Sequence, residues 1–148
     1  MKKELDEYLV KKYPLIFRDR YESMQKTAMC WGFDCSDHWF FIIDNLCESI
    51  QTYINNHNEW KLPAADPLPQ VVATQVKEKF GMLEFYCNMP DRHISGMIHL
   101  ATNMSYHTCE FCGSIKDVGH TKGWVYTICK ECYDNSIEDR VKQLKWEL

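Results

Sequence analysis

The sequence lacks most of the features that would identify a function at once. Its 148 residues contain no apolar run near the roughly 20 residues that a membrane-spanning helix needs, so we expect a soluble protein without a membrane partner. It has no glycine-rich phosphate loop, no Gly-x-Ser-x-Gly elbow and no His-Glu-x-x-His zinc motif. Carboxylate pairs at a defined spacing are missing too. These absences favour a binding protein over an enzyme, and we assign no catalytic residue.

The chain also lacks a basic excess. Its formal net charge is −4, and residues 22–60 carry one lysine against six acids. The segment 105–133 is balanced, with three lysines and three acids. A protein that neutralises many phosphates of a duplex normally shows a basic stripe. Nucleic-acid binding is therefore an alternative that the charge does not favour.

Two CxxC pairs are the most informative feature that is present. Cys109-Glu-Phe-Cys112 and Cys129-Lys-Glu-Cys132 are separated by sixteen residues, a spacing typical of a zinc ribbon. We predict that these four cysteines bind one Zn²⁺ ion within a ribbon over 105–133, and that Gly113 turns the chain with a positive φ. Because four thiolates fill the tetrahedral site, the ion is expected to be structural.

Other uses of these cysteines fit less well. A redox CxxC of the thioredoxin type is usually a single pair at the start of a helix. Disulfides need an oxidising compartment, whereas the N-terminal residues show no apolar signal segment, so we expect a reduced, cytosolic chain. Iron in a four-thiolate site is not separable from zinc by spacing, and zinc is the default.

The pattern of apolar residues predicts an α+β fold in one domain of 1–148. We expect a helical part over 1–69, with a first helix ending near Pro14, loop and short helical turns over 13–34, and a long helix capped by Ser36 or Asp37. The apolar face of this helix recurs at spacings of three and four: Trp39, Ile43, Leu46, Cys47, Ile50 and Ile54. Prolines at 63, 67 and 69 predict an extended connection over 58–69.

The second half is predicted to alternate between strands and helices. Residues 70–104 comprise an antiparallel hairpin of 71–77 and 82–87, joined at Lys79-Phe80-Gly81, and a helix capped by Asp91. In the ribbon, Gly119 and Gly123 are expected to bracket a turn. A last helix over 134–148 should pack its apolar stripe on the ribbon, placing the ribbon between helices. The tryptophans at 60, 124 and 146 are expected to fill edges of the core.

Two further groups of residues are candidate sites. Cys30, Cys35 and His38 lie within nine positions, and Cys47 is the nearest fourth ligand for a second metal site; core and capping roles are the simpler interpretation. Lys77, Lys79 and Arg92 are predicted to form a small cationic spot at one end of the hairpin, where an anion or nucleotide would bind. A solvated strand edge is the competing interpretation.

The order of motifs resembles a family of small phage and prophage proteins. The resemblance rests on Cys30-Trp-Gly-Phe33, Asp37-His-Trp-Phe40, residues 75–86 with Val76-Lys-Glu-Lys-Phe-Gly81, and the cysteine knuckles with Gly123-Trp124. Members commonly have Gly-Asp-Gly-Trp where this chain has Ser36-Asp37-His38-Trp39. The resemblance implies a viral origin, a location in the host cell cytoplasm and a zinc site, but no mechanism.

Three functional hypotheses follow. The first is a zinc-stabilised phage-type protein that recognises a host protein, such as a defence or regulatory factor. The second is a nucleic-acid-binding zinc-ribbon accessory protein. The third is a nucleotide- or anion-binding protein, or an enzyme, with a pocket near Lys77, Lys79 and Arg92 or around Asp37 and His38.

Overall fold

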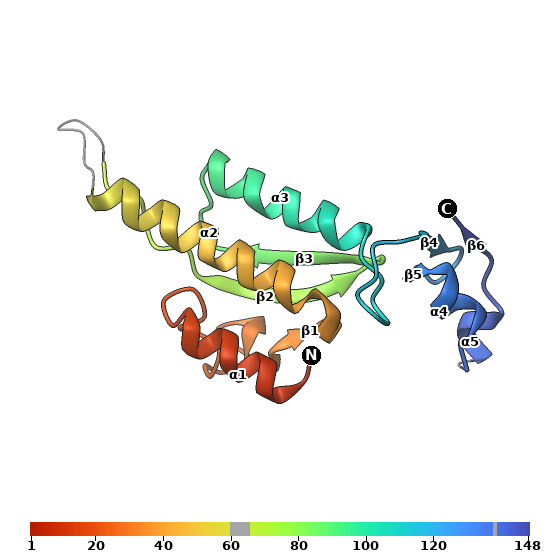
Figure 1. The fold of residues 1–148 in the computed structure, drawn as a ribbon. Coiled ribbons are helices and arrows are strands. Elements are labelled where there is room, and N and C mark those ends of the chain that lie inside the picture. The colour runs from red at the N-terminus through yellow and green to blue at the C-terminus, as the bar shows by residue number, and fades with distance from the viewer. Residues whose placement is uncertain (60–65, 138) are drawn as a thin grey trace.

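The computed structural model describes residues 1–59, 66–137 and 139–148, and its elements are labelled in Figure 1. The main body contains α1 (Lys3–Lys12), η1 (Ala28–Trp31), β1 (Phe33–Asp34), η2 (Asp37–Trp39), α2 (Phe40–Glu59), β2 (Ala73–Lys79), β3 (Met82–Cys87) and α3 (Arg92–Tyr106). The C-terminal part contains β4 (Val118–Thr121), β5 (Thr127–Cys129), α4 (Lys130–Asp134), α5 (Asp139–Lys142) and β6 (Trp146–Glu147). The α+β class is confirmed. Residues 60–65 of the predicted connection, with Trp60 and Pro63, lie outside the described residues.

A three-stranded sheet in the order β1-β2-β3 organises the main body. The predicted hairpin is confirmed: β2 and β3 pair antiparallel around the two-residue turn Phe80-Gly81, whose φ angles are +54° and +74°. Two positive φ angles are the signature of a type I′ turn, whose twist matches that of the flanking strands. β1 was not predicted. It pairs parallel to β2, with Phe33 opposite Val76.

The two long helices begin where the sequence predicts. The Ser36 hydroxyl accepts a hydrogen bond from the His38 amide at 3.1 Å, just before η2 continues into α2. The Asp91 carboxylate accepts one from the Ile94 amide at 2.8 Å and starts α3. Both bonds satisfy amides that the first helical turn leaves without a partner.

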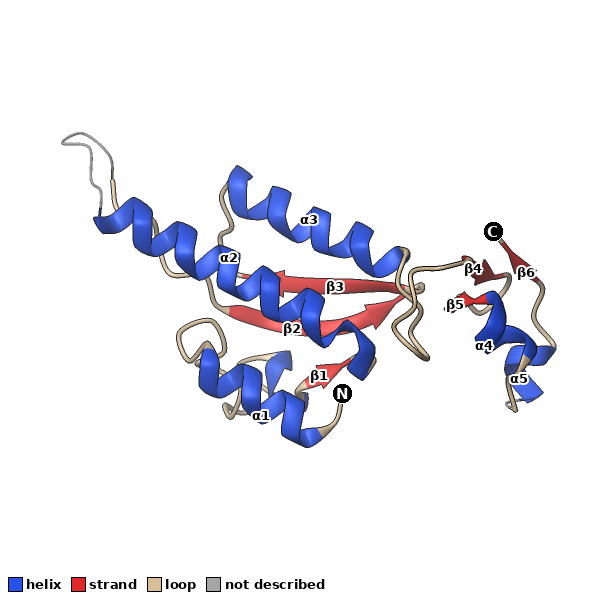
Figure 2. Ribbon diagram, viewed as in Figure 1, coloured by secondary structure: helices blue, strands red, loops and turns tan. Residues whose placement is uncertain are grey.

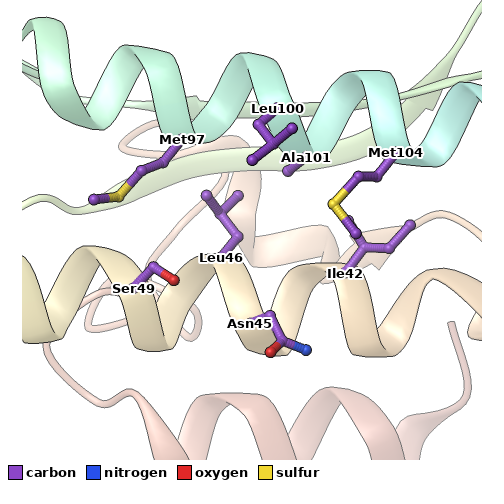
Figure 3. A pocket seen from close by; sticks show the side chains of 8 residues that line it. All are labelled: Ile42, Asn45, Leu46, Ser49, Met97, Leu100, Ala101 and Met104. Atoms are coloured by element: carbon purple, nitrogen blue, oxygen red, sulfur yellow. The ribbon is translucent and has the colours of Figure 1, made fainter.

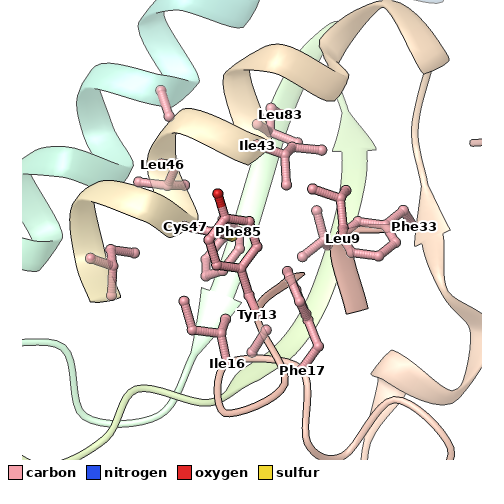
Figure 4. Packing of buried hydrophobic residues seen from close by; sticks show 14 of the residues in the cluster. Leu9, Tyr13, Ile16, Phe17, Phe33, Ile43, Leu46, Cys47, Leu83 and Phe85 are labelled. Atoms are coloured by element: carbon pink, nitrogen blue, oxygen red, sulfur yellow. The ribbon is translucent and has the colours of Figure 1, made fainter. Parts of the chain in front are cut away.

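The core lies between the N-terminal segment, α2 and the hairpin. Figure 4 shows side chains from these three sources meeting in one cluster, and Figure 2 shows the helices and the sheet that supply them. Phe17 and Phe33 pack edge to face with centroids 4.9 Å apart. Tyr13 is buried and its hydroxyl donates to Asp44, which ties the end of α1 to α2. The predicted core face of α2 is buried, namely Ile43, Leu46, Cys47, Ile50 and Ile54.

The prediction of one helix over 134–148 is wrong. The chain forms the short helices α4 and α5 and then β6, which pairs antiparallel with β4. Gly119 explains how β6 fits: it lies inside β4 rather than beside a turn, and a Cβ there would stand 2.2 Å from the Glu147 carbonyl oxygen. Of the predicted apolar stripe, Val141 is buried whereas Ile137 is 92% exposed. Pairing to the edge of β4 therefore replaces helical packing.

Long-range hydrogen bonds attach the ribbon to the main body. The Trp39 indole donates to the Thr108 carbonyl at 3.0 Å, and the Ser36 hydroxyl donates to the Glu110 carbonyl. The Thr127 hydroxyl donates to the Gly81 carbonyl at 2.5 Å, which joins β5 to the turn of the hairpin. These bonds position the ribbon beside the Phe80-Gly81 turn.

Candidate metal centre and neighbouring clefts

Four cysteine side chains come together in the ribbon. The Sγ atoms of Cys109, Cys112, Cys129 and Cys132 all lie within 4.8 Å of one another. Those of Cys112 and Cys129 are 3.7 Å apart. A tetrahedral ion with metal–sulfur bonds of about 2.3 Å places its ligands about 3.8 Å apart, so this pair is already at ligand spacing. The donor set and the geometry therefore fit a four-thiolate metal site.

Two similar knuckles present these sulfurs. In the first, the Phe111 amide donates to Cys109 Sγ at 3.4 Å, and in the second the Cys132 amide donates to Cys129 Sγ at 3.4 Å. Gly113 closes the first knuckle with φ +75°, as predicted, and its amide donates to the Cys109 carbonyl at 2.8 Å. Amides aimed at sulfur stabilise the thiolate that a metal requires.

The two cysteines of each knuckle lie in different environments. Cys109 and Cys129 are buried, whereas Cys112 is exposed. Burial raises the pKa of Cys109. Burial acts in the same direction on Cys112, but hydrogen bonds from the Ser114 amide and the neighbouring thiols outweigh it and lower the pKa of Cys112. The thiol with the lowered pKa is thus also the exposed one, which an incoming ion can reach.

Glu110 connects the first knuckle to β5 through hydrogen bonds. Its amide donates to the Thr127 carbonyl at 2.9 Å, and its carboxylate accepts from the Thr127 amide at 2.7 Å. Burial raises the pKa of Glu110 to about 7, although the hydrogen bond from Thr127 favours the ionised form. These two hydrogen bonds join the first knuckle to β5.

The structure does not assemble the second set of candidate ligands. Within the described ranges, the ribbon cysteines are the one group of three or more His, Cys, Asp or Glu residues whose ligand atoms gather this closely. Cys35 and Cys47 belong to the hydrophobic core instead. Burial raises the pKa of Cys35 to about 12 and that of Cys47 well above its usual value. Both behave as small apolar residues with inert thiols.

The predicted cationic spot is also not formed. Lys79 precedes the turn of the hairpin, whereas Arg92 begins α3, which follows the opposite end of β3 (Figure 1). Lys77 points to the open face of the sheet, with its ammonium 6.0 Å from the centroid of the Tyr86 ring. The length of β3 therefore separates Lys79 from Arg92.

An aromatic cleft that the sequence did not predict lies between the hairpin turn and the ribbon. We call it the Phe80–Trp124 cleft; it has a volume of about 240 Å³ and is lined by Glu78, Lys79, Phe80, Gly123, Trp124 and Val125. Phe80 is 67% exposed and Trp124 is 66% exposed. The expectation that Trp124 fills a core edge is wrong, because its ring lies in this open cleft. Trp146 is half-buried and donates its indole N–H to the Ile128 carbonyl.

A second depression lies between α2 and α3. Figure 3 shows Ile42 and Leu46 of α2 facing Met97, Ala101 and Met104 of α3. Its volume is about 110 Å³, whereas pockets for small molecules typically have about 300–1,000 Å³. It is therefore a packing crevice between two helices rather than a ligand pocket.

The chain matches no protein-family model, no curated protein and no solved structure. Among the described residues, no helix combines the length and the apolar character needed to span a bilayer. The functional interpretation therefore rests on the thiol cluster and on the surfaces around it.

Proposed function

We propose that the protein is a zinc-stabilised recognition protein that binds a protein partner through the Phe80–Trp124 cleft. The observation that carries the proposal is the backbone of Phe80. A bulky residue at φ +54° is strained, and here the strain holds a phenyl ring in solvent next to an exposed indole. Strain of this kind is typical of functional sites, and Trp and Phe in a cleft are typical anchors of protein interfaces.

Zinc has a structural role in this proposal. The 3.7 Å separation of two sulfurs and the four-thiolate donor set support a tetrahedral ion, for which zinc is the default. When bound, zinc supplies a cross-link between the knuckles and no reactive position, because all four ligands come from the protein. The cross-link positions β5 and Trp124, and hence one wall of the cleft.

Paired charges favour a protein partner over nucleic acid. The ammonium groups of Lys122 and Lys145 lie 2.7 and 2.9 Å from the carboxylate of Glu147, and Lys130 pairs with Asp134. Three lysines of the C-terminal part thus lie beside two carboxylates, which reduces the positive charge that phosphates would meet there. The resemblance to phage proteins suggests that the partner is a host protein in the cytoplasm of the infected cell.

Affinity capture tests the proposal. The zinc-loaded full chain and its Phe80→Asn and Trp124→Ser variants are immobilised and exposed to host lysate. We expect a protein that the wild type retains and that both variants lose. Met89→Asn is the matched control, because Met89 is also an exposed apolar residue, at 72%, with a positive φ of +35°.

Three results would argue against this function. Equal retention by the Phe80→Asn variant would show that the cleft is not the binding surface. Loss in the Met89→Asn control would show that any exposed apolar residue matters. Retention of nucleic acid with steep salt dependence would favour the ribbon accessory hypothesis instead.

A further inference from the structure

The free edge of β3 has two halves with different hydrogen-bonding states. β3 is an outer strand of the sheet β1-β2-β3, and α3 runs alongside it (Figure 1). At the half near the turn, α3 side chains occupy the edge: the Leu83 amide donates to Ser105 Oγ at 2.8 Å, and Thr102 Oγ1 donates to the Leu83 carbonyl at 2.9 Å. The peptide groups of Leu83 therefore point away from β2.

The antiparallel pattern extends this direction to the rest of the strand. Residues two apart on a strand present their peptide groups to the same side. Since Leu83 points outward, the amide and carbonyl groups of Phe85 and Cys87 point outward as well. Within the described part of the chain, no hydrogen bond from α3 reaches these four groups. A strand edge with open donors and acceptors is a template for another extended chain.

A groove is present at this open half. It has a volume of about 400 Å³ and runs between β3 and α3, lined by Glu84, Phe85, Tyr86, Cys87, Pro90, Ser95, Ile98, His99 and Thr102. Strand residues form one wall and helix residues form the other. This arrangement of an edge strand beside a helix is the one in which extended peptides add to a sheet.

We infer that the groove between β3 and α3 binds an extended peptide segment of a partner protein as an additional strand paired with Phe85 and Cys87. The site is separate from the Phe80–Trp124 cleft and goes beyond the function proposed above. A second copy of the chain is a poor occupant, because each copy carries its own α3 against this edge and two such edges would collide.

Charge defines the kind of segment that fits. Glu84 lies on the open face of the sheet, and it forms no ion pair with another described residue. Its cross-strand neighbour Lys77 instead lies over the Tyr86 ring. On the other face, Ile98 of α3 offers apolar contact in the groove. A segment that alternates apolar and cationic residues therefore matches both faces.

The test uses a synthetic peptide and the zinc-loaded full chain. The probe is an acetylated and amidated pentapeptide of alternating valine and lysine, titrated into isotope-labelled protein up to millimolar concentration. We expect saturable amide shifts at Phe85, Cys87 and Ile98. N-methylation of the central valine removes one backbone donor and should weaken binding about tenfold.

A pair of neighbouring variants locates the site. Ser95 is exposed and lines the groove, whereas Gly96 is exposed and a side chain there meets nothing within 4 Å. Ser95→Arg should reduce the affinity about tenfold or more, and Gly96→Arg should leave it within about twofold. The amide spectrum of each variant reports folding, and the N-methylated probe tests the site even if a variant unfolds.

Four outcomes would overturn the inference. They are an absence of shifts at Phe85 and Cys87 at any probe concentration, shifts confined to Phe80 and Trp124, equal binding of the N-methylated probe, and shifts that depend on protein concentration without peptide. The last would show pairing between copies. Shifts confined to Phe80 and Trp124 would support the Phe80–Trp124 cleft while they overturn this inference, and the other three results do not bear on that cleft. The two proposals therefore fail independently.

Discussion

Replacing Phe80 by asparagine should separate stability from binding. Asn-Gly is the preferred sequence of a type I′ turn, so the change relieves backbone strain while it removes the phenyl ring from the cleft. A non-glycine residue in the left-handed region costs about 1–2 kcal/mol, and much of this cost is avoided by asparagine. The variant should therefore keep its fold while it loses the proposed partner.

The opposing terms are of similar size. Phe80 is 67% exposed and so buries about a third of its surface, which stabilises the fold by about 0.5–1 kcal/mol. The Lys79 ammonium lies 5.6 Å from the ring centroid and adds about 0.5 kcal/mol at this exposed site. We expect the free energy of unfolding of Phe80→Asn to stay within about 1 kcal/mol of wild type.

Phe80→Ala is the matched comparison. It loses the same ring contacts, but alanine has a lower preference for the left-handed region than asparagine has. Its free energy of unfolding should therefore be about 1 kcal/mol below that of Phe80→Asn. Denaturant unfolding of the zinc-loaded chains measures both differences. If Phe80→Ala is as stable as Phe80→Asn, the backbone of Phe80 is not strained and the main support for the cleft is lost.

Three further predictions concern the metal centre, the C-terminal strand and the junction between the ribbon and the main body. Cys112→Ser should lose bound zinc and lower the free energy of unfolding by several kcal/mol, because the binding energy of a structural metal contributes to folding, whereas Cys30→Ser should change neither. Elemental analysis and thermal melts measure both quantities, and full zinc occupancy in Cys112→Ser would refute the ligand assignment. Gly119→Ala should lower the free energy of unfolding by about 1–3 kcal/mol, because its Cβ would stand 2.2 Å from the Glu147 carbonyl oxygen. Gly96→Ala, on the open face of α3, should raise it by about 0.5–1 kcal/mol, and unfolding curves that rank the two variants in reverse would contradict the β4–β6 pairing. Trp39→Phe should cost about 1–3 kcal/mol by leaving the Thr108 carbonyl without its donor, and an unchanged unfolding curve would show that this bond does not hold the ribbon to the core.

Local signals in the sequence predicted the features that short segments determine. The CxxC spacing predicts the thiol cluster because each knuckle is fixed by bonds within four residues, such as the Phe111 amide to Cys109 Sγ. Asp91 predicts the start of α3 for the same reason. Features that depend on distant partners were missed. β1 has two residues, too few for a periodic pattern, and exists only because Val76 offers an edge.

The wrong predictions also concern features that depend on distant partners. The apolar spacing of residues 137–148 also suits a helix, and only the edge of β4 and the space left by Gly119 decide in favour of β6. The predicted cationic spot does not form, because the hairpin places Lys79 and Arg92 at opposite ends of β3. One signal for the cleft was present in the sequence: a Phe-Gly turn between two strands places an aromatic residue where asparagine or aspartate is usual.

The two proposed surfaces should respond differently to removal of the metal. The ribbon has a small core in which Cys109, Ile128, Cys129 and Val141 are the buried residues described, and two of these four belong to the proposed metal site. So small a core does not stabilise a fold by itself, and the ribbon needs its cross-link. Phe85 and Cys87 instead belong to a sheet that is supported by the main core. Chelation should therefore abolish binding at the Phe80–Trp124 cleft and leave peptide binding at β3 intact. Equal loss at both sites would show that the metal stabilises the whole chain rather than the ribbon alone.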